Sequence, residues 1–205
     1  MANLIDLTVK NSVAVLTMNT AENRHNPAFL AEFNLHLDHI EADKSIHSVV
    51  LTSASDKSWS LGIDLEWMAN PSILPAAISD FMLQITQLLQ RIVTFPMPII
   101  AALNGHTYGN GAVLACACDF RFMKSDKGFF CFPEVDVLVP FVPSMFPIIN
   151  KAIPQTFFNR LAMTGERVGA QQLFENNVIE AVFSNSDELQ AGVIEFAAQF
   201  NKNRW

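Results

Sequence analysis

The chain predicts an α/β fold, because segments with the apolar periodicity of strands alternate with segments that have the periodicity of helices. Strands separated in this way by helices are expected to pair in parallel. Half of the 205 residues are hydrophobic, which is sufficient for one sizeable core. No internal repeat, low-complexity stretch or linker interrupts the pattern. We therefore predict a single domain over residues 1–205.

The first half of the chain contains a hairpin, two amphipathic helices and a strand. Strands are expected over residues 5–9 and 13–18, joined through residues 10–12, and a further strand over residues 49–53. Apolar residues three to four positions apart predict two helices, the second of which ends at Pro96 and Pro98. The first helix is marked by Phe29, Phe33, Leu37 and Ile40, and the second by Ile78, Phe81, Ile85, Leu88, Leu89 and Ile92.

The second half continues the alternation. We expect strands at 99–103, 120–123, near 129–132 and at 178–183, and helices from Ala112, near 155–163 and near 170–175. A last helix should begin at an N-cap on Ser186 or Asp187. The apolar stretch from Val137 to Ile149 contains three prolines and is too short to span a bilayer. It is expected to form a buried wall or pocket lining.

Composition excludes several classes of function. A net charge of −7 and a pI near 5.1 argue against nucleic acid as a partner. The N-terminus lacks the pattern of a signal peptide, and no membrane partner is expected. The three cysteines show no C-x-x-C spacing and are expected to be reduced core thiols of a cytoplasmic protein. His36 and His39 lack further ligands nearby, so we expect no metal.

Two glycine-containing turns are candidates for a reactive site. The strand after Pro98 runs through Gly109-Asn110-Gly111 into a small-residue helix, whose first N–H groups lack helical partners. Upstream, Gly62 precedes Ile63 at another helix-like start. The N–H groups of Ile63 and Asn110 would then approach one oxygen from two directions, as an oxyanion hole requires.

These turns and the motifs around them resemble those of the crotonase, or enoyl-CoA hydratase/isomerase, family. The resemblance extends to about residue 182. The resemblance implies a β-β-α spiral with stacked sheets, and homotrimers or dimers of trimers. It also implies an acyl-CoA thioester as substrate, with coenzyme A as part of that substrate and no separate cofactor. Further C-terminal helices are implied to begin at about residues 184–205, and this helical region is expected to be shortened. The motifs in family order are Ser60–Leu65, Pro98–His106, Gly109–Gly111, Cys118–Arg121, Phe132–Val135 and Met163–Glu166.

The resemblance also implies which groups react. The thioester carbonyl would lie between the N–H groups of Ile63 and Asn110. Of the two glutamates that hydratases use, the first position falls on Val113 and the second on Glu134. One base suffices to take a proton from C2 of a 3-enoyl thioester and return it at C4. The pattern is therefore closest to enoyl-CoA isomerases of fatty acid oxidation, with Glu134 as the acid and base.

Several other residues are candidates for the site. Asp64 is expected to cap or brace the helix that follows Ile63, and Asp136 is expected at the surface. His106 is expected to be a hydrogen-bonded structural residue. Arg24 and Lys57 could contact coenzyme A phosphates. The acyl pocket is assigned to Trp67, Met68, Val113, Leu138 and Phe141, with Phe81 as a further candidate.

The sequence leaves three alternatives to the isomerase. A hydratase or thioester hydrolase of the same family would need Asp64, Asp136 or another acid in place of the missing glutamate. A degenerate member that binds acyl-CoA without turnover is compatible with Val113 and Asn110. A Ser-His-Asp hydrolase is disfavoured, because the sequence around Ser60 lacks the first glycine of the nucleophile elbow.

Overall fold

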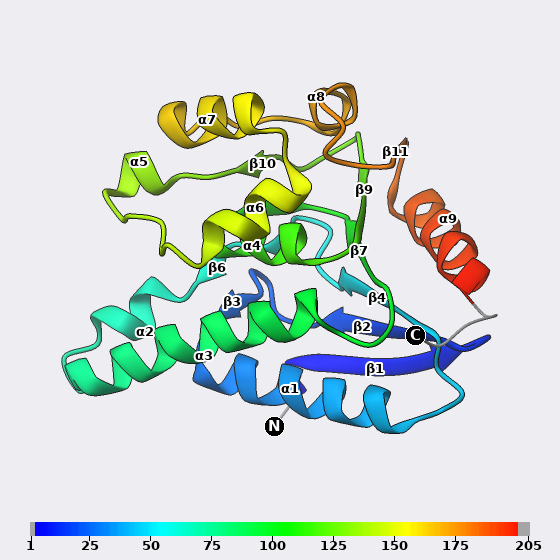
Figure 1. The fold of residues 1–205 in the computed structure, drawn as a ribbon, viewed down its shortest axis with the longest axis horizontal. Coiled ribbons are helices and arrows are strands. Elements are labelled where there is room, and N and C mark those ends of the chain that lie inside the picture. Colours follow the sequence, from blue (N-terminus) through cyan, green and yellow to red (C-terminus); the bar gives the residue numbers. More distant parts are fainter. Residues whose placement is uncertain (1–2, 201–205) are drawn as a thin grey trace.

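A computed structural model describes residues 3–200 of the chain and has the predicted α/β fold (Figure 1). Its largest sheet has six strands in the order β1-β2-β4-β7-β9-β11. The strands are β1 (Ile5–Lys10), β2 (Val13–Met18), β3 (Arg24–His25), β4 (Ser48–Ser53), β5 (Ser58–Ser60), β6 (Gly62–Ile63), β7 (Ile99–Leu103), β8 (His106–Tyr108), β9 (Phe120–Lys124), β10 (Phe130–Cys131) and β11 (Ala181–Phe183). The helices are α1 (Pro27–Ala42), α2 (Leu65–Ala69), α3 (Pro75–Val93), α4 (Asn110–Ala117), α5 (Glu134–Val137), α6 (Met145–Ala152), α7 (Gln155–Thr164), α8 (Ala170–Glu175) and α9 (Ser186–Ala197), followed by the 3-10 helix η1 (Ala198–Phe200).

Parallel pairing prevails in this sheet, as predicted. Only β1 and β2 pair antiparallel, whereas β2, β4, β7, β9 and β11 run parallel. Successive side chains of a strand point to opposite faces. Thus Val13 and Val15 of β2 belong to one apolar cluster, and Ala14 and Leu16 belong to another.

Helices cover both faces of the sheet. The larger cluster includes residues of α1, α3 and α4, whereas α9 packs on the other face, at the right of Figure 1. The predicted last helix is therefore present, but its N-cap is Asn185 rather than Ser186 or Asp187. The Asn185 side chain accepts from the N–H of Glu188 at 2.9 Å, which leaves Ser186 and Asp187 inside the first turn.

Short strands beside α4 position the site. β5, β8 and β10 form a three-stranded parallel sheet, and β3 pairs parallel with β6. The predicted helix from Ala112 begins at Asn110 instead, and all its residues are buried. A β-carbon on Gly111 would overlap the backbone of Ser60, so glycine at this position lets α4 lie directly against β5.

The segment from Val137 to Ile149 is not a buried wall, but the alternative prediction of a pocket lining is confirmed, since Val137, Val139 and Phe141 line surface pockets. Val137, Leu138, Val139 and Phe146 are all exposed to a substantial degree, and Leu138 is 89% exposed. Met145 and Ile149, on helix α6, are buried in the core, and Phe141, Val142 and Ile148 pack partly buried against it. Pro147 fits this unpredicted helix because it lies in the first turn, where its missing N–H has no helical role.

The fold places the cysteines in the core. Cys116, Cys118 and Cys131 are free and buried, as predicted. Burial raises the pKa of the Cys116 and Cys118 thiols to about 12, so they are poor nucleophiles. Within residues 3–200, no helix combines the length and apolar character that crossing a membrane requires.

Candidate active site

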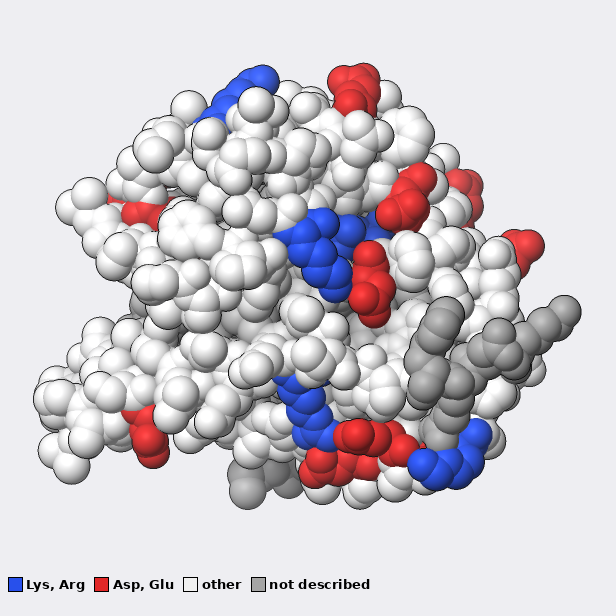
Figure 2. Space-filling model, in the orientation of Figure 1, with Lys and Arg blue, Asp and Glu red and all other residues white. Residues whose placement is uncertain are grey.

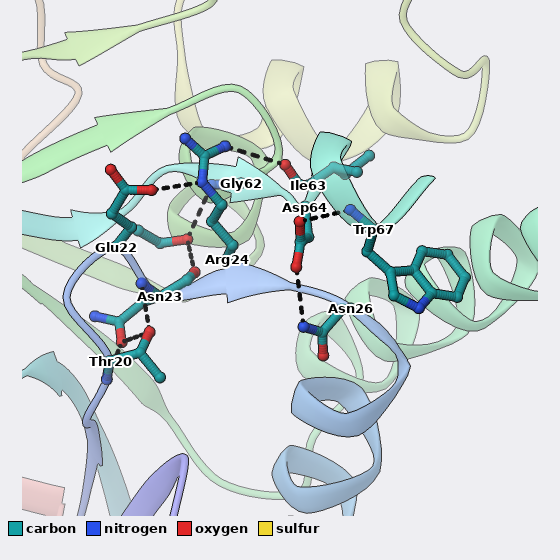
Figure 3. Close-up of polar contacts among 10 residues, drawn as sticks. Thr20, Glu22, Asn23, Arg24, Asn26, Gly62, Ile63, Asp64 and Trp67 are labelled. Atoms are coloured by element: carbon teal, nitrogen blue, oxygen red, sulfur yellow. Dashed lines mark hydrogen bonds and ion pairs between the residues drawn. The ribbon is translucent and has the colours of Figure 1, made fainter. Parts of the chain in front are cut away.

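The first glycine turn joins β6 to α2 (Figure 3). Asp64 is the N-cap of α2, as predicted: its carboxylate accepts from the N–H of Trp67 at 2.9 Å and from the Asn26 side chain at 3.1 Å. Arg24 lies on the other side of the turn, where its guanidinium donates to the carbonyl of Ile63 at 3.4 Å and pairs with Glu22 at 2.7 Å. Both hydrogen bonds of the Asp64 carboxylate thus stabilise the turn.

The second turn joins β8 to α4. Gly109 is the N-cap of α4 and has φ of +53°, a left-handed conformation that favours glycine. Asn110 follows as the first residue of the helix and is only 7% exposed. The first N–H groups of a helix have no intrahelical acceptor and carry the positive end of its dipole. The N-terminus of α4 is therefore suited to hold negative charge on a ligand.

The two turns lie against each other. A β-carbon on Gly62 would be 2.8 Å from the backbone nitrogen of Asn110, so only a residue without a side chain permits this approach. Gly62 also has φ of +77°. Ile63 and Asn110 consequently line one cavity, although they are 47 positions apart in the sequence.

The cavity has a volume of about 230 Å³. Its residues come from both turns and from the start of α5, and the left margin of the molecule is indented between the parts that carry α2 and α5 (Figures 1 and 2). Most of the lining is apolar, and Arg24 and Glu134 are its charged members. The lining residues are Arg24, Leu61, Ile63, Leu65, Tyr108, Gly109, Asn110, Pro133, Glu134, Val137 and Val139.

Glu134 is the acidic residue that lines the same cavity. Its Oε1 lies 3.7 Å from the position that a β-carbon on Gly109 would occupy, and its Oε2 is buried without a hydrogen-bond partner. Burial raises the pKa of the Glu134 carboxyl from 4.5 to about 7. A carboxyl with this pKa exchanges a proton readily at neutral pH, as a general acid–base requires.

Other predicted residues lie elsewhere. Val113 is fully buried in α4 and does not line the cavity. Trp67 packs edge-on against Phe81, with centroids 4.9 Å apart, and its ring lies on the far side of Asp64 from Arg24 (Figure 3). Met68 packs against the same core, outside the cavity lining.

Three further predicted site residues face two other depressions. Leu138 and Phe141 line an apolar groove of about 470 Å³ that shares Glu134 and Val139 with the cavity. Leu138 ends α5 with φ of +55° and does not line the cavity, although its neighbours Val137 and Val139 do. Lys57 lines a separate depression with His106 and Lys127. The structure therefore does not bring Lys57 together with Arg24.

The remaining predicted residues occupy structural or surface positions. Asp136 is exposed and does not line the cavity. His106 accepts from the N–H of Phe129 at 3.3 Å and is structural, as predicted. The part of the chain that the structure describes contains no cluster of three or more potential metal-ligating side chains.

Comparison with known proteins identifies the family of this chain. The sequence model described as enoyl-CoA hydratase/isomerase matches residues 8–204. The chain belongs to this family. It is 26% identical to enoyl-CoA delta isomerase 2 of Arabidopsis thaliana over 82% of this chain and 71% of that protein. It is 30% identical to (E)-benzylidenesuccinyl-CoA hydratase of Thauera aromatica, over 89% of this chain and 70% of that protein.

Solved structures agree with the family assignment. The crystal structure of an enoyl-CoA hydratase from Geobacillus kaustophilus superimposes with a TM-score of 0.88 at 26% identity, covering 99% of this chain and 76% of that one. The protein is thus an acyl-CoA enzyme of the enoyl-CoA hydratase/isomerase family with the crotonase fold. Isomerases and hydratases are similarly close to it, so the reaction itself depends on the residues of this site.

Sequence reasoning missed several contacts of this site. Leu61, Leu65 and Tyr108 line the cavity, and their positions next to the two glycine turns were a usable signal. His25 was also missed, although its ring nitrogen lies 2.8 Å from the side-chain nitrogen of Asn110. Nothing in the local pattern around His25 indicates a partner 85 positions away.

Proposed function

We propose that the protein moves a double bond of an acyl-CoA thioester from C3 to C2, with Glu134 as its single acid–base group. The N–H groups of Ile63 and Asn110 hold the thioester oxygen. The strongest support is the carboxyl of Glu134, which burial gives a pKa of about 7. It is the one acid among the described residues that line the cavity between the two turns.

In the proposed reaction, the ionised Glu134 takes the proton from C2 of a 3-enoyl thioester. The electrons of the broken C–H bond delocalise over C2 to C4 and the thioester oxygen, forming a dienolate. Charge developing on that oxygen is stabilised by the two N–H groups, because preorganised donors gain most where charge appears in the transition state. Glu134 then gives the proton to C4, leaving the double bond between C2 and C3.

Other acids near the site offer no second proton-transfer group. Asp64 is held by two hydrogen bonds as a helix cap, and Asp136 is exposed outside the cavity lining. Val113, at the position of the first hydratase glutamate, has an apolar side chain enclosed by the core. Water activation by two carboxylates therefore has no support among these residues, whereas a one-base shift does.

Arg24 is the proposed contact for the phosphates of coenzyme A. It lines the cavity next to Ile63, and it retains guanidinium donors beyond those used by Glu22 and the Ile63 carbonyl. The proposal does not depend on Lys57, because that residue faces a different depression.

Hydration is the second candidate. The observation that favours it is the 30% identity to the Thauera aromatica hydratase, against 26% to the plant isomerase. A hydratase would need a second group for water, and a thioester hydrolase would release free thiol. A member that binds acyl-CoA without turnover would do neither.

One experiment separates these functions. The protein is incubated with 3-enoyl-CoA and 2-enoyl-CoA thioesters of several chain lengths, and double-bond shift, hydration and free thiol are measured separately. We expect the shift alone. Hydration without shift selects the hydratase, free thiol selects the hydrolase, and binding without any product selects the inactive binder.

We also propose that the chain assembles as a homotrimer or a dimer of trimers. Support comes from exposed apolar side chains along the groove beside α5 and α7, such as Leu138 and Met163. Light scattering over a range of concentrations tests this. A monomer at every concentration would contradict it.

A further inference from the structure

His25 lies where the two glycine turns meet. Its backbone forms part of β3 and pairs with Ile63, and its carbonyl accepts from the N–H of Asp64 at 2.9 Å. Its ring is 2% exposed and stacks on Phe29 with centroids 4.9 Å apart. The backbone of His25 thus fixes the first turn, while its ring lies between that turn and α4.

The ring joins a hydrogen-bond chain whose direction can be deduced. The hydroxyl of Ser60 donates to the carbonyl of Asn23 at 2.8 Å and accepts from the N–H of Gly62 at 3.2 Å. The hydroxyl hydrogen is therefore not available to the ring. Nε2 of His25, 3.0 Å from the same oxygen, must be the donor in that contact.

The other ring nitrogen must then accept. Burial lowers the pKa of His25 to about 3, so the ring is neutral at physiological pH and has one donor and one acceptor. Nδ1 consequently accepts from the Asn110 side-chain nitrogen at 2.8 Å. This assignment turns the carboxamide oxygen of Asn110 away from His25, and that oxygen has no donor in the structure.

These contacts tie both turns to one side chain. We infer that His25 is a positioning residue that holds the Asn110 turn against the Ser60–Gly62 segment, and so sets the geometry of the two oxyanion donors. The inference rests on the proposed role of the Ile63 and Asn110 N–H groups. His25 does not line the cavity, so it acts through Asn110 rather than on the substrate.

The kinetic test is a double-mutant cycle. His25→Leu removes both ring hydrogen bonds, and we expect kcat for the double-bond shift to fall by about tenfold or more with little change in KM, since oxyanion donors act mainly in the transition state. His25→Gln retains one donor and one acceptor and should recover much of the loss. In an Asn110→Gly background, His25→Leu should change kcat by less than about twofold, because no carboxamide remains to be held.

A matched control separates positioning from packing. Phe29→Leu removes the stacked ring next to His25 but leaves the hydrogen-bond chain in place. It should lower thermal stability without the loss of kcat seen in His25→Leu. Equal losses of kcat from His25→Leu in the wild-type and Asn110→Gly backgrounds would overturn the inference.

A spectroscopic readout keeps the inference testable without turnover. A saturated acyl-CoA labelled with carbon-13 at the thioester carbonyl is bound to the protein, and its carbonyl shift reports polarisation by the two N–H groups. We expect a downfield shift in the wild-type protein and in Glu134→Gln, and a smaller one in His25→Leu. If the wild-type protein polarises the carbonyl without moving the double bond, and His25→Leu reduces that polarisation, the isomerase proposal fails and the positioning role stands. An unchanged shift in His25→Leu overturns the positioning role.

The ring itself provides a test that does not depend on ligand. Nitrogen-15 NMR of the wild-type protein should show the Nε2–H tautomer, and Asn110→Gly should move the Nδ1 resonance towards that of a free acceptor. The Nδ1–H tautomer, or no response to Asn110→Gly, would contradict the proposed chain. This measurement also covers the case in which His25→Leu does not fold.

Discussion

The two glycine turns and the segment that carries Glu134 contribute to the same cavity but are built differently. The turns are buried, lie in backbone contact through Gly62, and have side-chain polar groups joined in a chain through Ser60 and His25. The segment from Glu134 to Phe146 is apolar but largely exposed, and Glu134 Oε2 lacks a partner. The proposed oxyanion donors are held in place by packing, whereas the proposed base, Glu134, loses solvation where it lies.

The largest effect should come from removing the base. Glu134→Gln preserves shape but cannot take a proton, so double-bond shift should fall by about 10²–10⁴. Binding of acyl-CoA should persist, because both turns are untouched. Asp136→Asn is the matched control, since it neutralises an exposed carboxyl of α5 that does not line the cavity. Activity of Glu134→Gln equal to that of the wild-type protein would show that another residue is the base.

The same substitution should reveal the free-energy cost of burying the Glu134 carboxyl. Burial raises the folded pKa of Glu134 from 4.5 to about 7, so the folded state binds this proton more tightly than the unfolded state. Stability is therefore lost as pH rises from about 4.5 to about 7. Glu134→Gln should be more stable than the wild-type protein by about 3 kcal/mol at pH 8 and nearly equal to it at pH 4.

Urea denaturation at both pH values measures this difference. The activity of the wild-type protein supplies a second readout, because kcat/KM should fall about tenfold per pH unit well below pH 7 as the base becomes protonated. A difference in stability that does not vary with pH would show that the carboxyl is as well solvated in the folded protein as in the unfolded chain.

The close contact of the turns can be tested at Gly111. A β-carbon there would overlap the backbone of Ser60, so Gly111→Ala should destabilise the protein by about 1–3 kcal/mol. Gly169 is the matched control, since a β-carbon on it meets nothing within 4 Å. Gly169→Ala should change stability by less than about 1 kcal/mol. Similar urea midpoints for the two variants would mean that α4 can move away from β5 at little cost.

The contrast between these regions also explains what the sequence could predict. The turns at Gly62 and Gly109 follow from local signals: apolar strands, glycines and small-residue helix starts. The exposure of Leu138 does not follow from such signals, because an apolar stretch has the same composition whether the fold covers it or not. The partnership of His25 with Asn110 was equally hidden, since it depends on how β3 and α4 are brought together in space.

The prediction that Glu134 lies near the oxyanion turns came from the family resemblance, and the cavity lining agrees with it. The acyl pocket was predicted less well. Trp67 and Met68 were chosen for their apolar character, which does not distinguish a residue facing a cavity from one facing the core. Val113 was placed there by the family resemblance, and its side chain is enclosed by the core. The direction in which the N–H groups of Ile63 and Asn110 point stays a prediction.

The smallest effect should appear at the exposed end of α5. Leu138 has φ of +55° and ψ of +35°, a left-handed conformation that costs a residue with a β-carbon about 1–2 kcal/mol. Asparagine tolerates this conformation better, and little apolar burial is lost because Leu138 is 89% exposed. Leu138→Asn should therefore stabilise the chain by about 0.5–1 kcal/mol in urea denaturation, whereas Val135→Asn, inside α5, should give no gain. A loss of stability that grows with protein concentration would instead mean that a second copy covers Leu138, and that the exposed segment is as tightly packed in the assembly as the turns are in the chain.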